Sequence, residues 1–235
     1  MASLSEKKKL LFYDSMADQF DMVVLRYDLN RRLEIVFGEL LEDAEVRGRT
    51  FLDVGCGTGW FSRRAIELGA DVVALDIGCE LLKKVRVKCE TDVVAADACA
   101  LPFGDDSFDI VLASESIEHT LDPKLALSEL YRVLRPGGTL VVTVPNQIWH
   151  FSATFATIFK VRHHEGFENW LGWFEMRREL ARLNASIEKM FGFHIVPPIV
   201  PGTERFIRYF DRFGGRIGPI MLNIAVRATK AGRCA

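Results

Sequence analysis

Short apolar runs alternate with longer amphipathic segments through the middle of the chain. The apolar runs are typical of buried strands and lie at residues 51–54, 71–76, 92–95, 108–113 and 139–144. Segments between them place apolar residues on one helical face and predict helices at residues 61–68, 80–88 and 123–134. Strands that alternate with helices in this way are joined by right-handed crossovers, so the pattern predicts an α/β fold with a doubly wound parallel sheet.

A turn with three glycines follows the first predicted strand. It is Gly55-Cys56-Gly57-Thr58-Gly59, and a helix is expected to begin just after it. Glycine adopts positive φ without strain and has no Cβ, so such a turn lets a ligand approach the backbone closely. A plain connection between strand and helix would need fewer glycines. The bulky Trp60 stands where the dinucleotide-binding fingerprint requires a third small residue, which disfavours NAD.

The strand and turn together resemble motif I of the class I S-adenosylmethionine (SAM) methyltransferases, in its type-11 group. Two further segments are similar to that family: Leu101 to Asp109, with the letters LPFGDDSFD, and the turn Arg135-Pro136-Gly137-Gly138. The resemblance covers about residues 50–146 and is weak on both flanks. It implies a Rossmann-like sheet of seven strands, mostly parallel with the last strand antiparallel, and S-adenosyl-L-methionine as the cofactor.

The resemblance also implies which residues bind the cofactor, because the family's motifs align with this sequence. An acidic residue at the end of the second strand, Asp76, is expected to accept hydrogen bonds from the ribose, and Asp97 and Ala98 to contact the adenine. The complete expected set is Asp53, Gly55, Cys56, Gly57, Thr58, Gly59, Asp76, Ile77, Asp97, Ala98, Ser114 and Glu115.

The flanks are expected to complete one domain of residues 1–235. Residues 10–29 predict one amphipathic helix or two short ones, and residues 31–42 predict another helix; in the resembling family this part forms a lid. The expected division is a helical cap at residues 1–45, a SAM-binding core at 46–146, and an acceptor-side insert that completes the sheet at 147–235.

The acceptor-side part carries three structural expectations. A helix is predicted at residues 174–191, a sixth strand opening at Gly192 to Val196, and the last strand at residues 221–228. The aromatic residues 149–173 either pack in the core or line an apolar acceptor pocket with Trp170 and Trp173 as its walls.

Composition and charge limit the class of protein. The five cysteines, an odd number without a CxxC pair, argue against a disulfide framework or a structural zinc site. No apolar run is long enough to span a bilayer and no signal peptide is recognisable, so a cytoplasmic protein is expected. The net charge is −2, with +6 on residues 151–235 and −8 on residues 1–150. This asymmetry is either incidental or directs the C-terminal part to an anionic substrate or membrane.

His119, after the fourth strand, is the candidate catalytic base, since imidazole accepts a proton near neutral pH. The alternative is a polar residue that shapes the loop. Glu115, Glu118 and His119 give the spacing E-x-x-E-H, which resembles metal-binding segments of ubiquinone-pathway O-methyltransferases and of small-RNA 2′-O-methyltransferases. Many metal-independent relatives carry a similar segment, and no metal ion is predicted.

The sequence therefore predicts a SAM-dependent methyltransferase that acts on a small-molecule acceptor, most simply at oxygen. Carbon or nitrogen of a quinone, an isoprenoid or other lipid, or a sugar is the alternative, because the acceptor side lies in the dissimilar flanks. A nucleic-acid substrate is disfavoured: the segment after the fourth strand lacks the [DN]-P-P-[YFW] tetrapeptide, and no dense basic run exists. A catalytically silent SAM-binding partner protein is the hypothesis from a different class.

Overall fold

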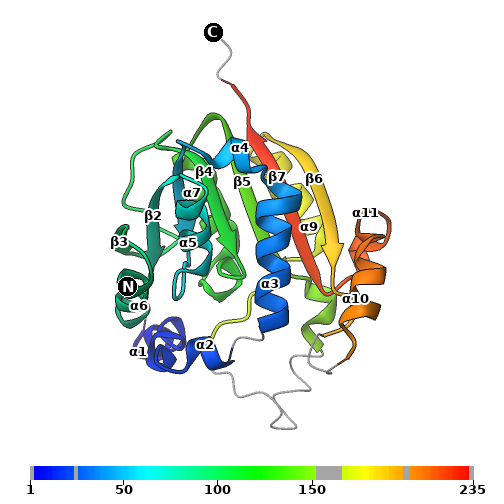
Figure 1. Cartoon of the computed structure of the whole chain (residues 1–235), viewed down its shortest axis with the longest axis horizontal. Helices are drawn as coiled ribbons and strands as arrows, with labels where there is room; N and C mark the ends of the chain where they lie inside the picture. The colour runs from blue at the N-terminus through cyan, green and yellow to red at the C-terminus, as the bar shows by residue number, and fades with distance from the viewer. Residues whose placement is uncertain (1–2, 24–25, 152–165, 198–201, 233–235) are drawn as a thin grey trace.

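The computed structural model describes residues 3–23, 26–151, 166–197 and 202–232. Its centre is one seven-stranded sheet with the order β3-β2-β1-β4-β5-β7-β6 (Figure 1). Strand β7 pairs antiparallel with both β5 and β6, whereas the pairs among β1 to β5 are parallel. The strands are β1 Thr50–Val54, β2 Asp71–Asp76, β3 Asp92–Ala95, β4 Phe108–Ser114, β5 Leu134–Pro145, β6 Ala185–Phe193 and β7 Asn223–Lys230. The predicted fold class is confirmed.

Alternate residues of the central strands feed two apolar cores on opposite faces of the sheet. Phe51 of β1 packs in one core with the π-helix η2 (Ile35–Leu40) and helix α5 (Trp60–Glu67). Leu52, its neighbour in the strand, packs in the other core with helices α7 (Pro123–Val133) and α9 (Trp173–Arg182). Both faces are therefore covered, as expected for parallel strands with nearly continuous apolar sequence.

Several helices begin where local sequence signals predicted them. Asp122 caps α7, since its Oδ1 accepts hydrogen bonds from the N–H groups of Lys124 and Leu125, and Pro123 occupies the first turn. Helix α6 (Cys79–Lys88) also begins and ends within one residue of its predicted bounds.

In the N-terminal part the predicted boundary was wrong: helix α3 (Arg26–Glu34) begins earlier than residue 31 and continues directly into η2. The remaining short helices are α1 (Leu4–Leu10), η1 (Asp14–Met16), α2 (Phe20–Val23), α4 (Asp43–Val46), η3 (Ile117–His119), η4 (Gln147–Trp149), α11 (Gly214–Ile217) and η5 (Gly218–Ile220).

The long helix predicted at residues 174–191 was wrong. Helix α9 ends at Arg182, and β6 already begins at Ala185, so the sixth strand ends at Phe193 instead of opening there. Asn184 makes the turn with a left-handed φ of +57°. Apolar spacing from residue 185 fits either element, and pairing along the whole of β7 decides in favour of the strand.

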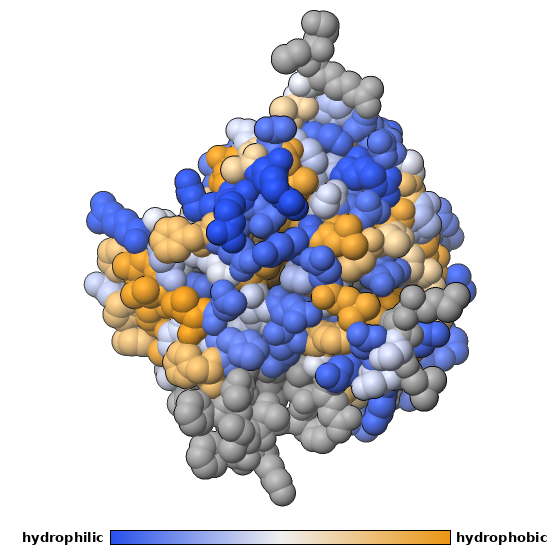
Figure 2. Space-filling model, turned by 180° about the vertical axis from the view of Figure 1, so that it is seen from behind, coloured by the Kyte–Doolittle hydropathy of each residue, from blue (hydrophilic) through white to orange (hydrophobic). Residues whose placement is uncertain are grey.

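Aromatic residues gather on the outside of helix α10 (Glu204–Asp211), which buries Ile207 toward the sheet. Phe206, Tyr209 and Phe213 are exposed. Figure 2 shows apolar side chains on this side of the molecule, at the left of the view. No helix of the described residues is sufficiently long and apolar to span a membrane.

Replacing Asn184 tests the turn that separates α9 from β6. Asn tolerates the left-handed conformation better than residues with a larger or less polar side chain, so Asn184→Ala should lower the free energy of unfolding by about 1 kcal/mol. Asn184→Gly is the control and should match the wild type or exceed it. Urea denaturation measures both variants, and equal destabilisation by Ala and Gly would contradict a conformational cause.

Candidate functional site

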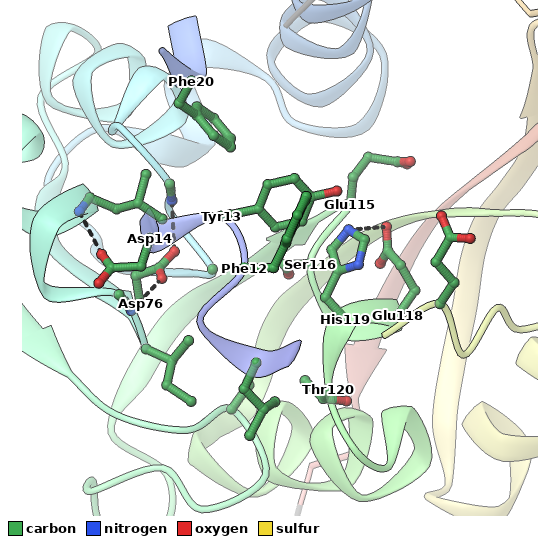
Figure 3. Close-up of a pocket in the computed structure, with 18 of the residues that line it drawn as sticks. Phe12, Tyr13, Asp14, Phe20, Asp76, Glu115, Ser116, Glu118, His119 and Thr120 are labelled. Carbon is green, nitrogen blue, oxygen red and sulfur yellow. Dashed lines mark hydrogen bonds and ion pairs between the residues drawn. The ribbon is translucent and has the colours of Figure 1, made fainter. Parts of the chain in front are cut away.

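A cavity of about 730 Å³ opens at the carboxyl ends of β1, β2 and β4. In an open α/β sheet this edge is where ligands bind. Its two ends differ in character. One end is formed by the glycine turn and the ends of β2 and β3, and the other by α3, the segment after β4 and residues that follow β6 (Figure 3). We call these the glycine end and the inner end.

At the glycine end, Asp76 holds the turn in place. Its Oδ2 accepts a hydrogen bond of 2.9 Å from the N–H of Gly57, and its Oδ1 one of 2.8 Å from the N–H of Gly78. Burial raises the pKa of Asp76 to about 6, although both N–H donors favour the ionised form. Gly55 has φ +71°, and a Cβ there would lie 2.3 Å from Ser116 Cβ, so the turn requires glycine. At Gly55 and Gly57 the floor of the cavity is therefore main chain without side chains.

The structure brings most of the predicted cofactor residues to the cavity wall. Those that line it are Gly55, Gly57, Asp76, Ile77, Asp97, Ala98 and Glu115. The other five, which lie behind the wall, are Asp53, Cys56, Thr58, Gly59 and Ser114. Their placement indicates a supporting position, and their predicted cofactor contacts stay predictions.

Asp53 illustrates the supporting position. It is 2% exposed, and its Oδ2 accepts a hydrogen bond of 2.6 Å from Ser62 Oγ in α5. Burial raises the pKa of Asp53 to about 6. The carboxyl group thus ties β1 to the first turn of the next helix.

The N-terminal segment covers the glycine end, where the family resemblance implied a lid, and the contacts that hold it there were not predicted. Asp14 caps α6, since its Oδ1 accepts hydrogen bonds from the N–H groups of Glu80 and Leu81. Asp21 Oδ1 accepts hydrogen bonds from Thr58 Oγ1 and from Trp60 Nε1. A short acidic segment is therefore fastened to the turn that carries the glycines.

Two aromatic rings of the same segment face the cavity. The Phe20 ring lies 3.4 Å from where a Cβ of Gly57 would be. The Tyr13 ring packs edge-on against His119 with 4.9 Å between ring centroids, and Figure 3 shows it between Asp76 and His119. These rings close the cavity from the N-terminal side.

His119 stands between the two ends of the cavity. Its Nδ1 lies 2.8 Å from the carbonyl oxygen of Phe167, which can only accept, so Nδ1 carries the hydrogen. In the neutral ring Nε2 then carries the lone pair, and it lies 3.8 Å from Glu118 Oε1. This tautomer gives a base at Nε2, next to the buried carboxyl group of Glu118.

The inner end collects buried ionisable groups. Burial raises the pKa of Glu115 to about 7, and it raises the pKa of Glu118 well above its usual range, with the charge of Glu115 as a further cause. Asp28, Arg32 and His194 line the same end. Sequence reasoning missed these three because they lie far apart in the chain and belong to no motif. Within the described ranges, no three His, Cys, Asp or Glu side chains are arranged to hold a metal ion.

The expected aromatic walls are only partly present. Trp170 lines the cavity, whereas Trp173 is 8% exposed and packs in the core with α9, so the two residues follow different ones of the two alternatives. Aromatic residues at positions 152–165 lie outside the described residues.

Known methyltransferases match this part of the chain. Residues 52–142 match the family described as "Methyltransferase domain". A demethylmenaquinone methyltransferase of Renibacterium salmoninarum is 41% identical over 138 residues, which are 55% of this chain and 58% of that protein. A malonyl-[acyl-carrier protein] O-methyltransferase of Erwinia billingiae is 36% identical over 130 residues, 54% and 52% of the two chains. A solved structure from Thermotoga maritima, titled a SAM-dependent methyltransferase and possible histamine N-methyltransferase, has a TM-score of 0.68 at 18% identity and covers 94% of this chain and 99% of its own.

These matches confirm the predicted resemblance to SAM-dependent methyltransferases over residues 52–142, and the solved structures confirm the fold. The chain spans about half the length of the curated relatives it matches. The matched part contains the glycine turn, Asp76, Asp97 and His119, whereas α3 and His194 lie outside it.

Asp53→Asn tests the protonation of the supporting carboxyl group. The pKa of Asp53 is about 6 in the folded chain against an ordinary 3.8, so the folded state holds the proton more tightly and wild-type stability falls as pH rises between these values. Asn does not ionise, and the variant should therefore gain about 2 kcal/mol relative to wild type between about pH 4.5 and 7.5. Urea denaturation at both pH values measures the gain; a difference independent of pH would contradict it.

Proposed function

We propose that this chain, which belongs to the methyltransferase domain family over residues 52–142, transfers the methyl group of SAM to an oxygen atom of a small-molecule acceptor. One observation carries the proposal: a single cavity joins the open floor of the glycine turn to a polar inner end, with His119 Nε2 between them. Methyl transfer is an in-line displacement, which needs a donor and an acceptor aligned in one enclosed space.

The glycine end fits the donor. The backbone at Gly55 and Gly57 is exposed to the cavity, and the Asp76 carboxylate has acceptor capacity beyond its two N–H partners, which suits ribose hydroxyls. Asp97 and Ala98 line the wall where the family resemblance expects adenine. SAM bound here would supply an electrophilic methyl group.

The inner half of the cavity supports proton removal from the acceptor. A hydroxyl becomes a better nucleophile when a base takes its proton, and His119 is oriented for that task through Nδ1 and Phe167. Nε2 of the protonated ring would lie beside the Glu118 carboxyl group, whose carbonyl oxygen can accept a hydrogen bond even when that group carries its own proton. Phe20 and Tyr13 would exclude water from the reacting atoms.

Carbon methylation is the second candidate, because a matched relative is a demethylmenaquinone methyltransferase. A base that ionises a phenol can support methylation at either oxygen or carbon, because the negative charge of the phenolate is shared between its oxygen and the ring carbons. Isotope labelling of the transferred methyl group separates the two products by its carbon chemical shift.

The test measures SAM binding first and transfer second. Calorimetry should show binding of SAM and not of NAD, since Trp60 occupies the position of the fingerprint glycine. His119→Ala should then lower turnover by about 100-fold or more on any acceptor found among phenols and the reduced quinol form of demethylmenaquinone, with SAM affinity retained. NAD binding without SAM binding would contradict the function. Unchanged turnover in the variant would remove His119 as the base, and SAM binding without any transfer would favour a silent binding partner.

A further inference from the structure

His194 is a buried imidazole whose ring nitrogens have no hydrogen-bond partner within the described part of the chain. It is 0% exposed, and its ring stacks on Tyr27. Nδ1 lies 3.5 Å from Asp28 Oδ1 without forming a hydrogen bond. Burial lowers the pKa of His194, so the ring is neutral. Because buried polar groups are nearly always satisfied, such a ring on a cavity wall indicates a ligand.

Three further polar atoms at the inner end are buried without a hydrogen-bond partner. Glu115 Oε1, Glu118 Oε2 and Arg32 Nε are buried and have no hydrogen-bond partner among the described residues. The other oxygen of Glu115 accepts a hydrogen bond of 2.9 Å from Asn223 Nδ2, which turns the carboxyl group toward β7. All of these side chains line the same cavity.

Backbone strain coincides with these residues. Glu115 has φ +50° and His194 has φ +57°, both in the left-handed region that residues other than glycine rarely adopt. The main-chain N–H of His194 donates to Asp211 Oδ1 at 2.8 Å, and Asp211 Oδ2 accepts from Arg31 Nε of α3 at 2.9 Å. The fold thus fixes His194 against α3 in a costly conformation, and strain of this kind gathers at binding sites.

The charge of the cavity restricts what binds. Its described lining contains one cationic side chain, Arg32, whose guanidinium pairs with Asp28 in the same helix. The lining also contains seven carboxyl groups, those of Asp14, Asp28, Asp76, Asp97, Glu115, Glu118 and Glu168. Those carboxyl groups that are ionised repel an anionic acceptor. At the inner end the charged guanidinium of Arg32 opposes an ammonium group, and the raised pKa values of Glu115 and Glu118 leave little negative charge there to attract one.

We propose that Arg32, Glu115, Glu118 and His194 form a recognition subsite for a neutral acceptor group with at least two hydroxyls, and that the subsite rejects carboxylates. The proposal rests on the proposed function and names its substrate class. Hydroxyls donate to the unpartnered oxygens of Glu115 and Glu118 and accept from Arg32 Nε, a combination that neither an ether nor a carboxylate offers. A hydroxyl that reaches Glu118 also lies beside His119 Nε2.

Four small aromatic probes test the subsite in the full-length chain saturated with S-adenosylhomocysteine. They are catechol, with two neutral hydroxyls; 1,2-dimethoxybenzene, with the same oxygens and no donor; benzoate; and benzylammonium. Calorimetry should find catechol bound at least about 10-fold more tightly than the other three, since hydrogen bonds to charged groups discriminate by that factor or more. Equal binding of all four, or tighter binding of benzoate, would overturn the proposal.

Glu115→Gln keeps the size of the side chain and replaces its ionisable carboxyl group by an amide. It should weaken catechol at least about 10-fold and leave the affinity for S-adenosylhomocysteine within about twofold, an interval below 1 kcal/mol. Glu67→Gln, on the outer face of α5 in an ion pair with Arg63, is the matched control and should change neither affinity. If Glu115→Gln lowered the affinities for catechol and for S-adenosylhomocysteine equally, Glu115 would have a role in cofactor binding, and its place in the subsite would be overturned.

A second variant guards against misfolding of the first. Asp28→Asn with Arg32→Met removes the buried pair without changing the net charge, and it should also abolish the preference for catechol over 1,2-dimethoxybenzene. A preserved preference in this variant would contradict the subsite. Failure of the wild type to bind S-adenosylhomocysteine would refute the proposed function itself, whereas binding without discrimination among the probes refutes the subsite alone.

Discussion

Two hydrogen bonds to Asp76 determine the geometry on which the site depends. By accepting from the N–H groups of Gly57 and Gly78, the carboxylate joins the glycine turn after β1 to the turn after β2. The parallel register of β1 and β2 brings these turns to one edge of the sheet, where a buried acidic group can serve both. This link adds to the main-chain hydrogen bonds of 2.7 and 3.0 Å that the N–H groups of Gly55 and Cys56 donate to the carbonyl oxygen of Leu75, so the turn is held to β2 by both main chain and side chain.

Around this floor, the chain separates two kinds of binding chemistry. The glycine end offers main-chain atoms and one shared carboxylate, which suits a ligand recognised by its ribose and its charge. The inner end offers side chains from α3, from the segment after β4 and from the end of β6. Several of them have buried polar atoms without a hydrogen-bond partner among the described residues. His119 lies between them, and its tautomer is set by a main-chain carbonyl rather than by either ligand. Preorganisation of this kind lets the protein hold an acceptor and a base without rearranging polar groups during the reaction.

The sequence predicted the glycine end well because its signals are local. A strand, a turn and the acidic residue that ends the next strand are contiguous patterns, and the sheet brings them together by topology alone. The inner end was not predictable in the same way. Arg32 and His194 are 162 positions apart by their numbers, and only the docking of α3 against the end of β6 makes them neighbours. The error at residues 174–191 has a related cause: the pairing of β6 with β7 is a tertiary interaction, which apolar spacing does not reveal.

A structure of the chain with bound S-adenosylhomocysteine tests the central claim most directly. The account predicts ribose hydroxyls on Asp76, the adenine beside Asp97 and Ala98, and the sulfur directed past His119 toward the inner end. The same ligand with its ribose away from Asp76, or with its sulfur directed away from Glu115 and His194, would contradict the division of the cavity into a donor half and an acceptor half.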